Sequence, residues 1–207
     1  MPAYRLYWRE GSGSLVAEVA LALCGAAVER IHVADRASQR SPDFLAINPA
    51  GQIPVLILPD GTVLTETSAI VVALADAFPE SGILPPTGSA ARSTSLRWLM
   101  YMATTGYPAA LRTYYSERYT GDTAKTAHEA VRRAATAESD KLFAILAAAA
   151  KGPFLLGETV TMADVYLAML ADWHPPALEN AAISQIYHKV QSYPIIGEAW
   201  MRHEQSG

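Results

Sequence analysis

The chain has 207 residues, of which 51% are hydrophobic and 17% are charged, a balance that excludes a disordered protein. Its formal net charge is −4, and no cluster of lysine or arginine indicates a nucleic-acid or membrane-surface partner. No apolar run reaches the roughly 18 residues that a membrane-spanning helix needs. Because Cys24 is the single cysteine and Met1 opens no signal-peptide pattern, we expect a soluble cytoplasmic protein.

Strand and helix patterns alternate in the first part of the chain. Short apolar runs predict strands, and apolar residues spaced by three and four predict helices. The expected elements, in chain order, are a strand over 4–9, a helix from 15, a strand over 28–33, a helix over 42–47, strands over 54–58 and 62–64, and a helix from a Thr65 cap to about 78. Two strands joined through a helix are usually parallel, and Pro59-Asp60-Gly61 predicts a hairpin. This β-α-β-α-β-β-α order is that of a thioredoxin-like domain.

Prolines and glycines then mark residues 80–89 as a linker, and only helical patterns follow. Helix breaks are expected near four Gly- or Pro-containing points, at 119–121, 152–153, 175–176 and 193–194. The sequence therefore predicts an α/β thioredoxin-like domain over residues 1–79 and an all-helical domain over residues 90–207.

The stretch Asn-Pro-Ala-Gly-Gln-Ile-Pro-Val-Leu, residues 48–56, places Pro54 at the start of a strand. A proline is tolerated there only at an edge or a bend. A cis bond between Ile53 and Pro54 would turn the chain sharply and leave the backbone of Ile53 for a peptide ligand to pair with. An ordinary loop-to-strand turn is the alternative.

The segment Leu-Thr-Glu-Thr-Ser-Ala-Ile, residues 64–70, opens a helix. A helix N-terminus attracts a carboxylate, Thr67 adds a hydroxyl, and Glu66 offers a charge to an ammonium group. The segment thus suits a free amino-acid terminus, while simple helix capping is the alternative.

Residues 11–14, Gly-Ser-Gly-Ser, separate the first strand from the first helix. They suit either a flexible turn with Ser14 as N-cap or a hydroxyl aimed at a ligand beside a helix N-terminus. The local pattern leaves both interpretations open.

Together these segments resemble the glutathione S-transferase family, in the expected order and over nearly the whole chain. Residues 48–54 resemble its cis-proline loop, and Glu66-Thr67 resembles the glutamate-serine pair that grips the γ-glutamyl end of glutathione. Residues 154–164 resemble the capping-box segment of its C-terminal domain. Thr161 and Asp164 would form that box, so we assign both to folding.

The resemblance implies a residue-by-residue glutathione site. The backbone of Ile53 would pair with the cysteinyl part of glutathione. Pro54, the next residue, would be the cis proline. Glu66 and Thr67 would hold the γ-glutamyl group, and Gln52 would add a polar contact. Glutathione would be a co-substrate, with no permanently bound cofactor. We expect no metal, because the histidines show no ligand spacing.

The family's chemistry needs a group that stabilises the glutathione thiolate. Tyrosine-type members use a phenol where this chain has Trp8, and strand alternation puts Tyr7 on the opposite face. Beta-class members use a cysteine where this chain has Gly13. Serine-type members place serine directly after the loop glycine, which is Ser12. We therefore favour Ser12 as the catalytic hydroxyl, with Ser14 and Tyr7 as alternatives.

The electrophile site is less clearly marked in the sequence. In the family, the long helix after the linker lines this site. The resemblance therefore implies Tyr107, Tyr114 and Tyr115 on that helix, with Trp8 from the first strand. Packing between helices or in a dimer is the alternative for each tyrosine. Glu10 stands where a proline is common, and Tyr107 replaces a beta-class histidine, so the subclass stays open.

The family implies transfer of glutathione sulfur to a small hydrophobic electrophile, and a homodimer. Glutathione-dependent isomerisation, dehalogenation and peroxide reduction use the same fold and glutathione site, and they are alternatives. A non-catalytic binding protein that has kept the fold is a third hypothesis, which Glu66, Thr67 and Gln52 argue against.

Overall fold

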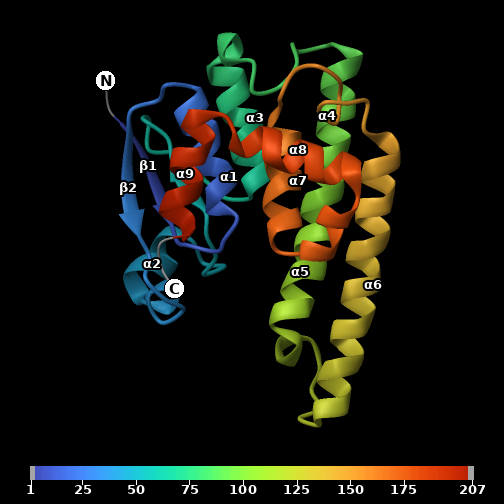
Figure 1. Ribbon diagram of the computed structural model, residues 1–207. Coiled ribbons are helices and arrows are strands. Elements are labelled where there is room, and N and C mark those ends of the chain that lie inside the picture. The colour runs from blue at the N-terminus through green and yellow to red at the C-terminus, as the bar shows by residue number, and fades with distance from the viewer. Residues whose placement is uncertain (1–2, 205–207) are drawn as a thin grey trace. The chain divides into compact units, whose positions relative to one another are not determined.

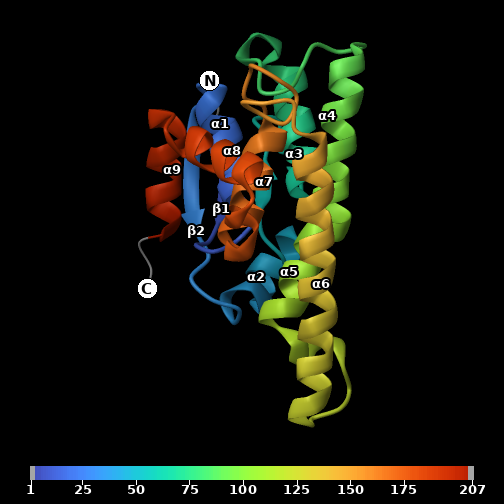
Figure 2. The same ribbon diagram turned by 45° about the vertical axis from the view of Figure 1, so that its right-hand side comes forward.

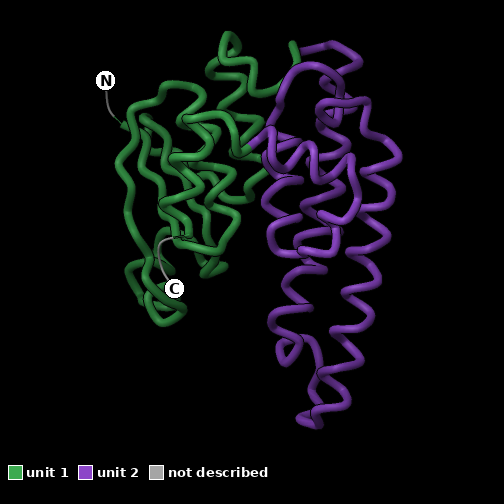
Figure 3. Tube along the Cα trace, in the orientation of Figure 1, with its two compact units in different colours: residues 1–86, 191–207 green, residues 87–190 purple. Residues whose placement is uncertain are grey.

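The computed structural model describes residues 3–204, which divide into two compact units (Figure 3). Unit 1 comprises the described residues up to 86 and from 191 onward, and unit 2 comprises residues 87–190. Unit 1 is therefore discontinuous in the sequence.

A four-stranded sheet with helices packed on it makes up unit 1 (Figure 1). The elements are β1 (Tyr4–Trp8), α1 (Ser14–Leu23), β2 (Val28–His32), η1 (Ser38–Arg40), α2 (Pro42–Ile47), β3 (Val55–Ile57), β4 (Val63–Leu64), α3 (Thr67–Ala77), η2 (Pro79–Ser81) and α9 (Pro194–Glu204). The strand order is β2-β1-β3-β4, with β1 parallel to β2 and antiparallel to β3, and β3 antiparallel to β4. The thioredoxin-like order predicted from the sequence is confirmed.

The sheet buries side chains on both faces. Leu6 pairs with Leu56 and Tyr7 with Val55, so alternation puts the two pairs on opposite faces. Phe44 of α2 packs on the Tyr7 face, together with Val55. Leu6 and Leu56 are fully buried on the other face. Along its length, α1 packs against both α3 and α9.

An ionic cluster ties α9 to α1. The Glu18 side chain on α1 is fully buried, and its carboxylate accepts hydrogen bonds from Arg30 of β2 at 2.7 Å and from Arg202 of α9 at 2.7 Å. The His203 imidazole lies 2.9 Å from the same carboxylate. The structure thus differs from the all-helical domain expected over 90–207, because these contacts place the last helix in unit 1.

Unit 2 is helical. The elements are α4 (Ala90–Tyr101), η3 (Met102–Gly106), α5 (Tyr107–Tyr114), η4 (Ser116–Tyr119), α6 (Lys125–Ala149), α7 (Met162–Asp172), η5 (Pro175–Glu179) and α8 (Ala181–Gln191), whose last residue falls in unit 1. Both ribbon views show α6 running beside α5 (Figures 1 and 2). In the part of the chain that the structure describes, no helix is long and apolar enough to cross a membrane.

A π-helical turn, η3, interrupts the long helix between α4 and α5. Pro108, in the first turn of α5, has no N–H to continue regular hydrogen bonding. Gly106 is buried against α6 and α7, where an added Cβ would lie 2.7 Å from Leu170 and 3.0 Å from Leu142. The glycine therefore permits a close approach of three helices.

A capping box starts α7. The Asp164 carboxylate accepts the N–H of Thr161 at 2.8 Å, the Thr161 hydroxyl at 3.0 Å and the N–H of Leu155 at 2.7 Å. All three residues are buried. One carboxylate therefore fixes both the start of α7 and the loop before it.

Candidate functional site

Asn48 holds the loop that precedes β3. Its side-chain amide donates to the C=O of Gln52 at 2.8 Å, and its side-chain oxygen accepts the N–H of Ala50 at 3.1 Å. Asn48 is buried, and Gln52 is exposed. The loop is therefore fixed from inside while the Gln52 side chain faces outward.

The bond between Ile53 and Pro54 is cis, as expected from the sequence. The Ile53 side chain packs on a small core that includes Phe44 and Val55. Among the described residues, no hydrogen bond engages the N–H or the C=O of Ile53. This stretch thus presents a backbone edge that can pair with an extended peptide.

Gly51 is required by the conformation of the same loop. Its φ is +62°, and an added Cβ would lie 3.1 Å from the Gln39 C=O and 3.3 Å from Leu45. We expect Gly51→Ala to lower the free energy of unfolding by about 2 kcal/mol, measured by denaturant titration. Gly25→Ala is the matched control, because Gly25 has a φ of +60° and open space at its Cβ. If the two variants lost equal free energies of unfolding, the contacts of the Gly51 Cβ position with Gln39 and Leu45 would contribute no cost.

Two serine hydroxyls meet at the start of α1. The Oγ atoms of Ser12 and Ser14 lie 2.7 Å apart. Each hydroxyl can donate to the Arg9 C=O, which lies 2.7 Å from the Ser12 Oγ and 3.0 Å from the Ser14 Oγ. Ser14 also accepts the Arg9 N–H at 3.2 Å. The cap residue of α1 is Gly13, without a side-chain cap bond, so the N-cap interpretation of Ser14 is wrong. Bonding to the strand end outcompetes capping at this position.

The tip of α3 touches this serine loop. The Thr67 hydroxyl donates to the Gly13 C=O at 3.3 Å, so it is used within the fold. Helix α3 begins at Thr67 with exposed Glu66 as cap at a φ of 63°, which corrects the predicted Thr65 cap. The first bond within the helix runs from the Ile70 N–H to the Glu66 C=O. The N-terminal end of a helix carries a partial positive charge that favours a bound anion.

The two aromatic residues at the end of β1 serve packing in unit 1. The Tyr7 ring meets Phe44 edge-on at 5.8 Å. The Trp8 ring lies 5.0 Å from the rings of both His32 and His203. Tyr7 and Trp8 therefore point to opposite faces, as alternation predicts, and each has its own set of ring contacts.

In unit 2, Trp173 connects two of the tyrosines that the sequence singled out. Its ring lies edge-on to Tyr107 at 5.4 Å, and its C=O accepts the Tyr114 hydroxyl at 2.8 Å. Partial burial, together with the Asp172 carboxylate, raises the pKa of Tyr114. The arrangement joins the end of α5 to the end of α7.

Tyr115 has a different environment, since the Arg118 guanidinium lies 3.6 Å from the centre of its ring. The structure thus groups Tyr107 and Tyr114 through a common partner and separates Tyr115 from them. Sequence reasoning missed Trp173. Its signal was an aromatic residue at the end of a helical run, directly before a proline-containing break.

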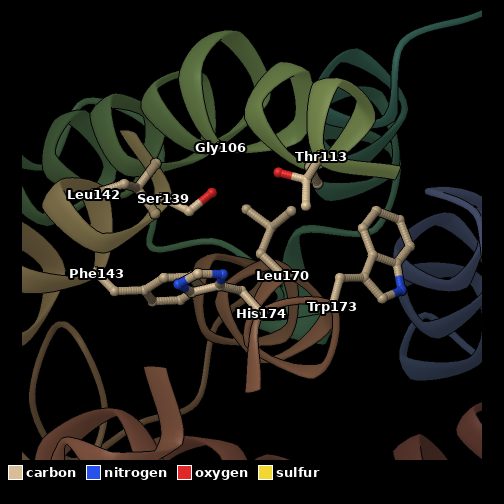
Figure 4. A pocket seen from close by; sticks show the side chains of 9 residues that line it. Gly106, Thr113, Ser139, Leu142, Phe143, Leu170, Trp173 and His174 are labelled. Carbon is tan, nitrogen blue, oxygen red and sulfur yellow. The ribbon is translucent and has the colours of Figure 1, made fainter. Parts of the chain in front are cut away.

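A small pocket lies beside this aromatic group (Figure 4). It is lined by Gly106, Ala110, Thr113, Ser139, Leu142, Phe143, Leu170, Trp173 and His174. Its volume of about 10 Å³ is near the lower limit for one water molecule. His174 is held in the wall by stacking on Phe143 and by a hydrogen bond between its Nε2 and the Asp140 carboxylate at 2.7 Å. In this conformation the pocket has no room for an organic substrate.

Within residues 3–204, no group of three or more His, Cys, Asp or Glu side chains is arranged to hold a metal ion. The polar groups at the start of α1 and α3 include hydroxyls and backbone N–H groups, with the Glu66 carboxylate at the cap of α3. The hydroxyls and N–H groups suit an organic anion or a thiolate as ligand.

Two family models match the chain. Residues 14–77 match the glutathione S-transferase N-terminal domain, and residues 100–194 match the glutathione S-transferase C-terminal domain. Together they span more than half of the chain, in the expected order. The chain belongs to the glutathione S-transferase family.

Individual relatives agree with this assignment. The chain is 30% identical to glutathione S-transferase GstA of Escherichia coli O157:H7, over 82% of this chain and 81% of that protein. It is 42% identical to a maleylacetoacetate isomerase of Rhizobium meliloti, over 38% of this chain and 37% of that protein. The structure of a sphingomonad glutathione S-transferase complexed with glutathione matches with a TM-score of 0.82 and 27% identity, over 98% of this chain and 100% of that chain.

Proposed function

We propose that this protein is a glutathione transferase that joins the sulfur of glutathione to a small hydrophobic electrophile. The observation that carries the proposal is the hydrogen bond from Thr67 to the Gly13 C=O. It holds the anion-favouring tip of α3 against the loop that carries Ser12. A ligand with a carboxylate and a thiol can therefore meet both features of unit 1 at once.

Each part of glutathione has a proposed partner in unit 1. The cysteinyl backbone pairs with Ile53 next to Pro54, where the edge is unpaired. The γ-glutamyl carboxylate binds at the start of α3 around Thr67, and Glu66 receives the ammonium group. Gln52, which is exposed beside this edge, adds a polar contact.

Ser12 is the proposed donor to the thiolate. A free thiol has a pKa near ~8.5, so only about 3% is ionised at neutral pH. A hydrogen bond to a charged group contributes roughly 1.5–3 kcal/mol, which lowers a pKa by about one to two units. One hydroxyl is thus sufficient to make thiolate abundant near pH 7, and the serine itself stays neutral.

Two measurements test the proposed function. Calorimetry with glutathione at millimolar concentration should show binding, and a chloronitroaromatic substrate should consume thiol in an enzyme-dependent reaction. Binding without turnover on any member of an electrophile panel would favour a non-catalytic binding protein. Absence of binding would overturn the proposal.

We expect Ser12→Ala to raise the pKa of the bound thiol by about one to two units and to slow conjugation near neutral pH roughly tenfold. Glutathione affinity should change little, because the peptide contacts stay. The pKa is measured by titrating the ultraviolet absorbance of the thiolate in the complex. Ser93→Ala, at an exposed position on α4, is the matched control and should behave as wild type. An unchanged pKa in Ser12→Ala would remove Ser12 from the mechanism.

A second candidate function is glutathione-dependent isomerisation, favoured by the 42% identity to a maleylacetoacetate isomerase over 80 residues. In such a reaction the thiolate adds to a conjugated double bond, the bond rotates, and the thiolate leaves unchanged. Conjugation consumes glutathione, whereas isomerisation regenerates it. Measuring product formation and thiol loss together therefore separates the two functions.

For the electrophile, we assign contacts to the aromatic residues Tyr107 and Tyr114, which Trp173 holds in place. Tyr115 is a weaker candidate because a guanidinium covers its ring. Trp8 is left out, since two imidazoles pack against it. A homodimer is part of the proposal on family grounds, and sedimentation analysis tests it.

A further inference from the structure

The two hydroxyls at the start of α1 share one backbone acceptor. Ser12 and Ser14 are both buried, and both lie within hydrogen-bond distance of the Arg9 C=O. Among the described residues, these hydroxyls are the hydrogen-bond partners of that carbonyl. The carbonyl therefore depends on the serine pair.

The two serines are not equivalent within the pair. The Ser14 Oγ accepts the N–H of Arg9 and can donate to the C=O of the same residue, so it is bonded to that backbone in both directions. The Ser12 Oγ accepts the Ser14 N–H at 3.3 Å, which fixes the oxygen but leaves its proton free to choose an acceptor. In the structure that proton has two acceptors within reach, the Arg9 C=O and the Ser14 Oγ.

The choice depends on Ser14. When Ser14 donates to the Arg9 C=O, the carbonyl is satisfied, and the Ser12 hydroxyl can turn toward a sulfur without leaving a buried acceptor unpaired. Without the Ser14 hydroxyl, Ser12 would be the remaining donor to that carbonyl. If the Ser12 hydroxyl then turned toward the ligand, the Arg9 C=O would lose its hydrogen bond.

We propose that Ser14 is a positioning residue, which occupies the Arg9 carbonyl so that Ser12 can donate its proton to the glutathione thiolate. The inference rests on the proposed function, since it requires glutathione in the site and Ser12 as the donor. It assigns Ser14 no contact with the ligand.

A double-mutant cycle on the pKa of the bound thiol tests this role. Wild type, Ser12→Ala, Ser14→Ala and the double variant are titrated as complexes with glutathione, with Ser93→Ala as control. Ser12→Ala and Ser14→Ala should each lower the acid dissociation constant of the thiol about 10- to 100-fold. The double variant should match Ser12→Ala alone, because Ser14 acts through Ser12. Ser14→Thr keeps the hydroxyl and should restore a low pKa.

The outcomes separate the inference from the proposed function. If wild type does not bind glutathione or does not lower its thiol pKa, the proposed function fails, and the inference fails with it. A low pKa in Ser14→Ala, or shifts that add in the double variant, overturns the inference alone. A shift in Ser14→Ala without one in Ser12→Ala makes Ser14 the direct donor and also overturns it. Should Ser14→Ala not fold, Ser14→Cys takes its place in the cycle, because a thiol keeps the side chain's shape but is only a weak hydrogen-bond donor.

Discussion

Glu18→Ala is expected to lower the free energy of unfolding by about 3 kcal/mol, because it removes a buried carboxylate that bonds two arginines and a histidine. The His203 side chain is 4% exposed and would be left without its carboxylate. Arg30 and Arg202 are 34% and 38% exposed, so solvent screens part of their loss and keeps the effect at the lower end of the range for a broken buried pair. Denaturant unfolding measures the change.

Glu29→Ala is the matched control, since Glu29 is exposed on β2 and should change stability by no more than about 0.5 kcal/mol. A similar loss in both variants would mean that the cluster contributes no more than an ordinary surface charge.

The same cluster makes stability depend on pH. Burial alone would raise the pKa of Glu18, but the hydrogen bonds with His203, Arg202 and Arg30 outweigh burial and lower the pKa from 4.5 to about 2. Since the folded pKa is the lower one, this stabilisation is present above about pH 4.5 and is lost as the pH falls toward 2. Glu18→Gln does not titrate, so its stability should fall less steeply over this range. Parallel slopes in the two proteins would contradict the prediction.

Asp164→Ala is the second large effect, with an expected loss of about 3 kcal/mol in the free energy of unfolding. The change leaves the N–H groups of Leu155 and Thr161 without their acceptor inside the protein, and each unsatisfied group costs about 1–3 kcal/mol. Loss of the capping box adds to this cost. Thermal and denaturant unfolding measure it.

Two further variants serve as comparisons for Asp164→Ala. Asp164→Asn keeps one acceptor oxygen and should lose less than the alanine variant. Glu158→Ala, at an exposed position in the preceding loop, should stay within about 0.5 kcal/mol of wild type. If Asp164→Ala is as stable as Glu158→Ala, the capping box contributes nothing measurable.

The two buried carboxylates have opposite pKa directions for a physical reason. Glu18 faces cationic side chains, which overcome the cost of burial. Burial raises the pKa of Asp164, because its partners are neutral N–H groups and a hydroxyl that only partly offset it. Charged partners, not burial alone, decide which form of a buried acid is favoured.

Local signals were enough to predict the order of strands and α-helices from β1 to α3. Ser41 caps α2 and Pro42 opens it, and both can be read from adjacent residues. The local pattern allowed either a cis bond before Pro54 or an ordinary turn, and the family resemblance implied the cis bond that the structure has. These features depend on neighbours in the sequence, and sequence patterns report neighbours well.

Features that depend on distant partners were not accessible in this way. Glu18 lies in an apolar helical pattern, and its partners Arg202 and His203 are 184 and 185 residues away. The pairing of Ser12 with Ser14 and their bonds to Arg9 were not predicted, because they depend on the path of the loop. The start of α3 was misplaced since several residues near Glu66 can cap a helix equally well.

The return of α9 to the first unit has a consequence for how the protein is made. A ribosome delivers β1 and α1 before residues 194–204, so the nascent chain carries the Glu18 carboxylate before Arg202 and His203 exist to meet it. Because α9 belongs to unit 1, that unit is completed only after the residues of unit 2 have been synthesised. The Glu18 carboxylate gains its two partners on α9 only when that helix has left the exit tunnel.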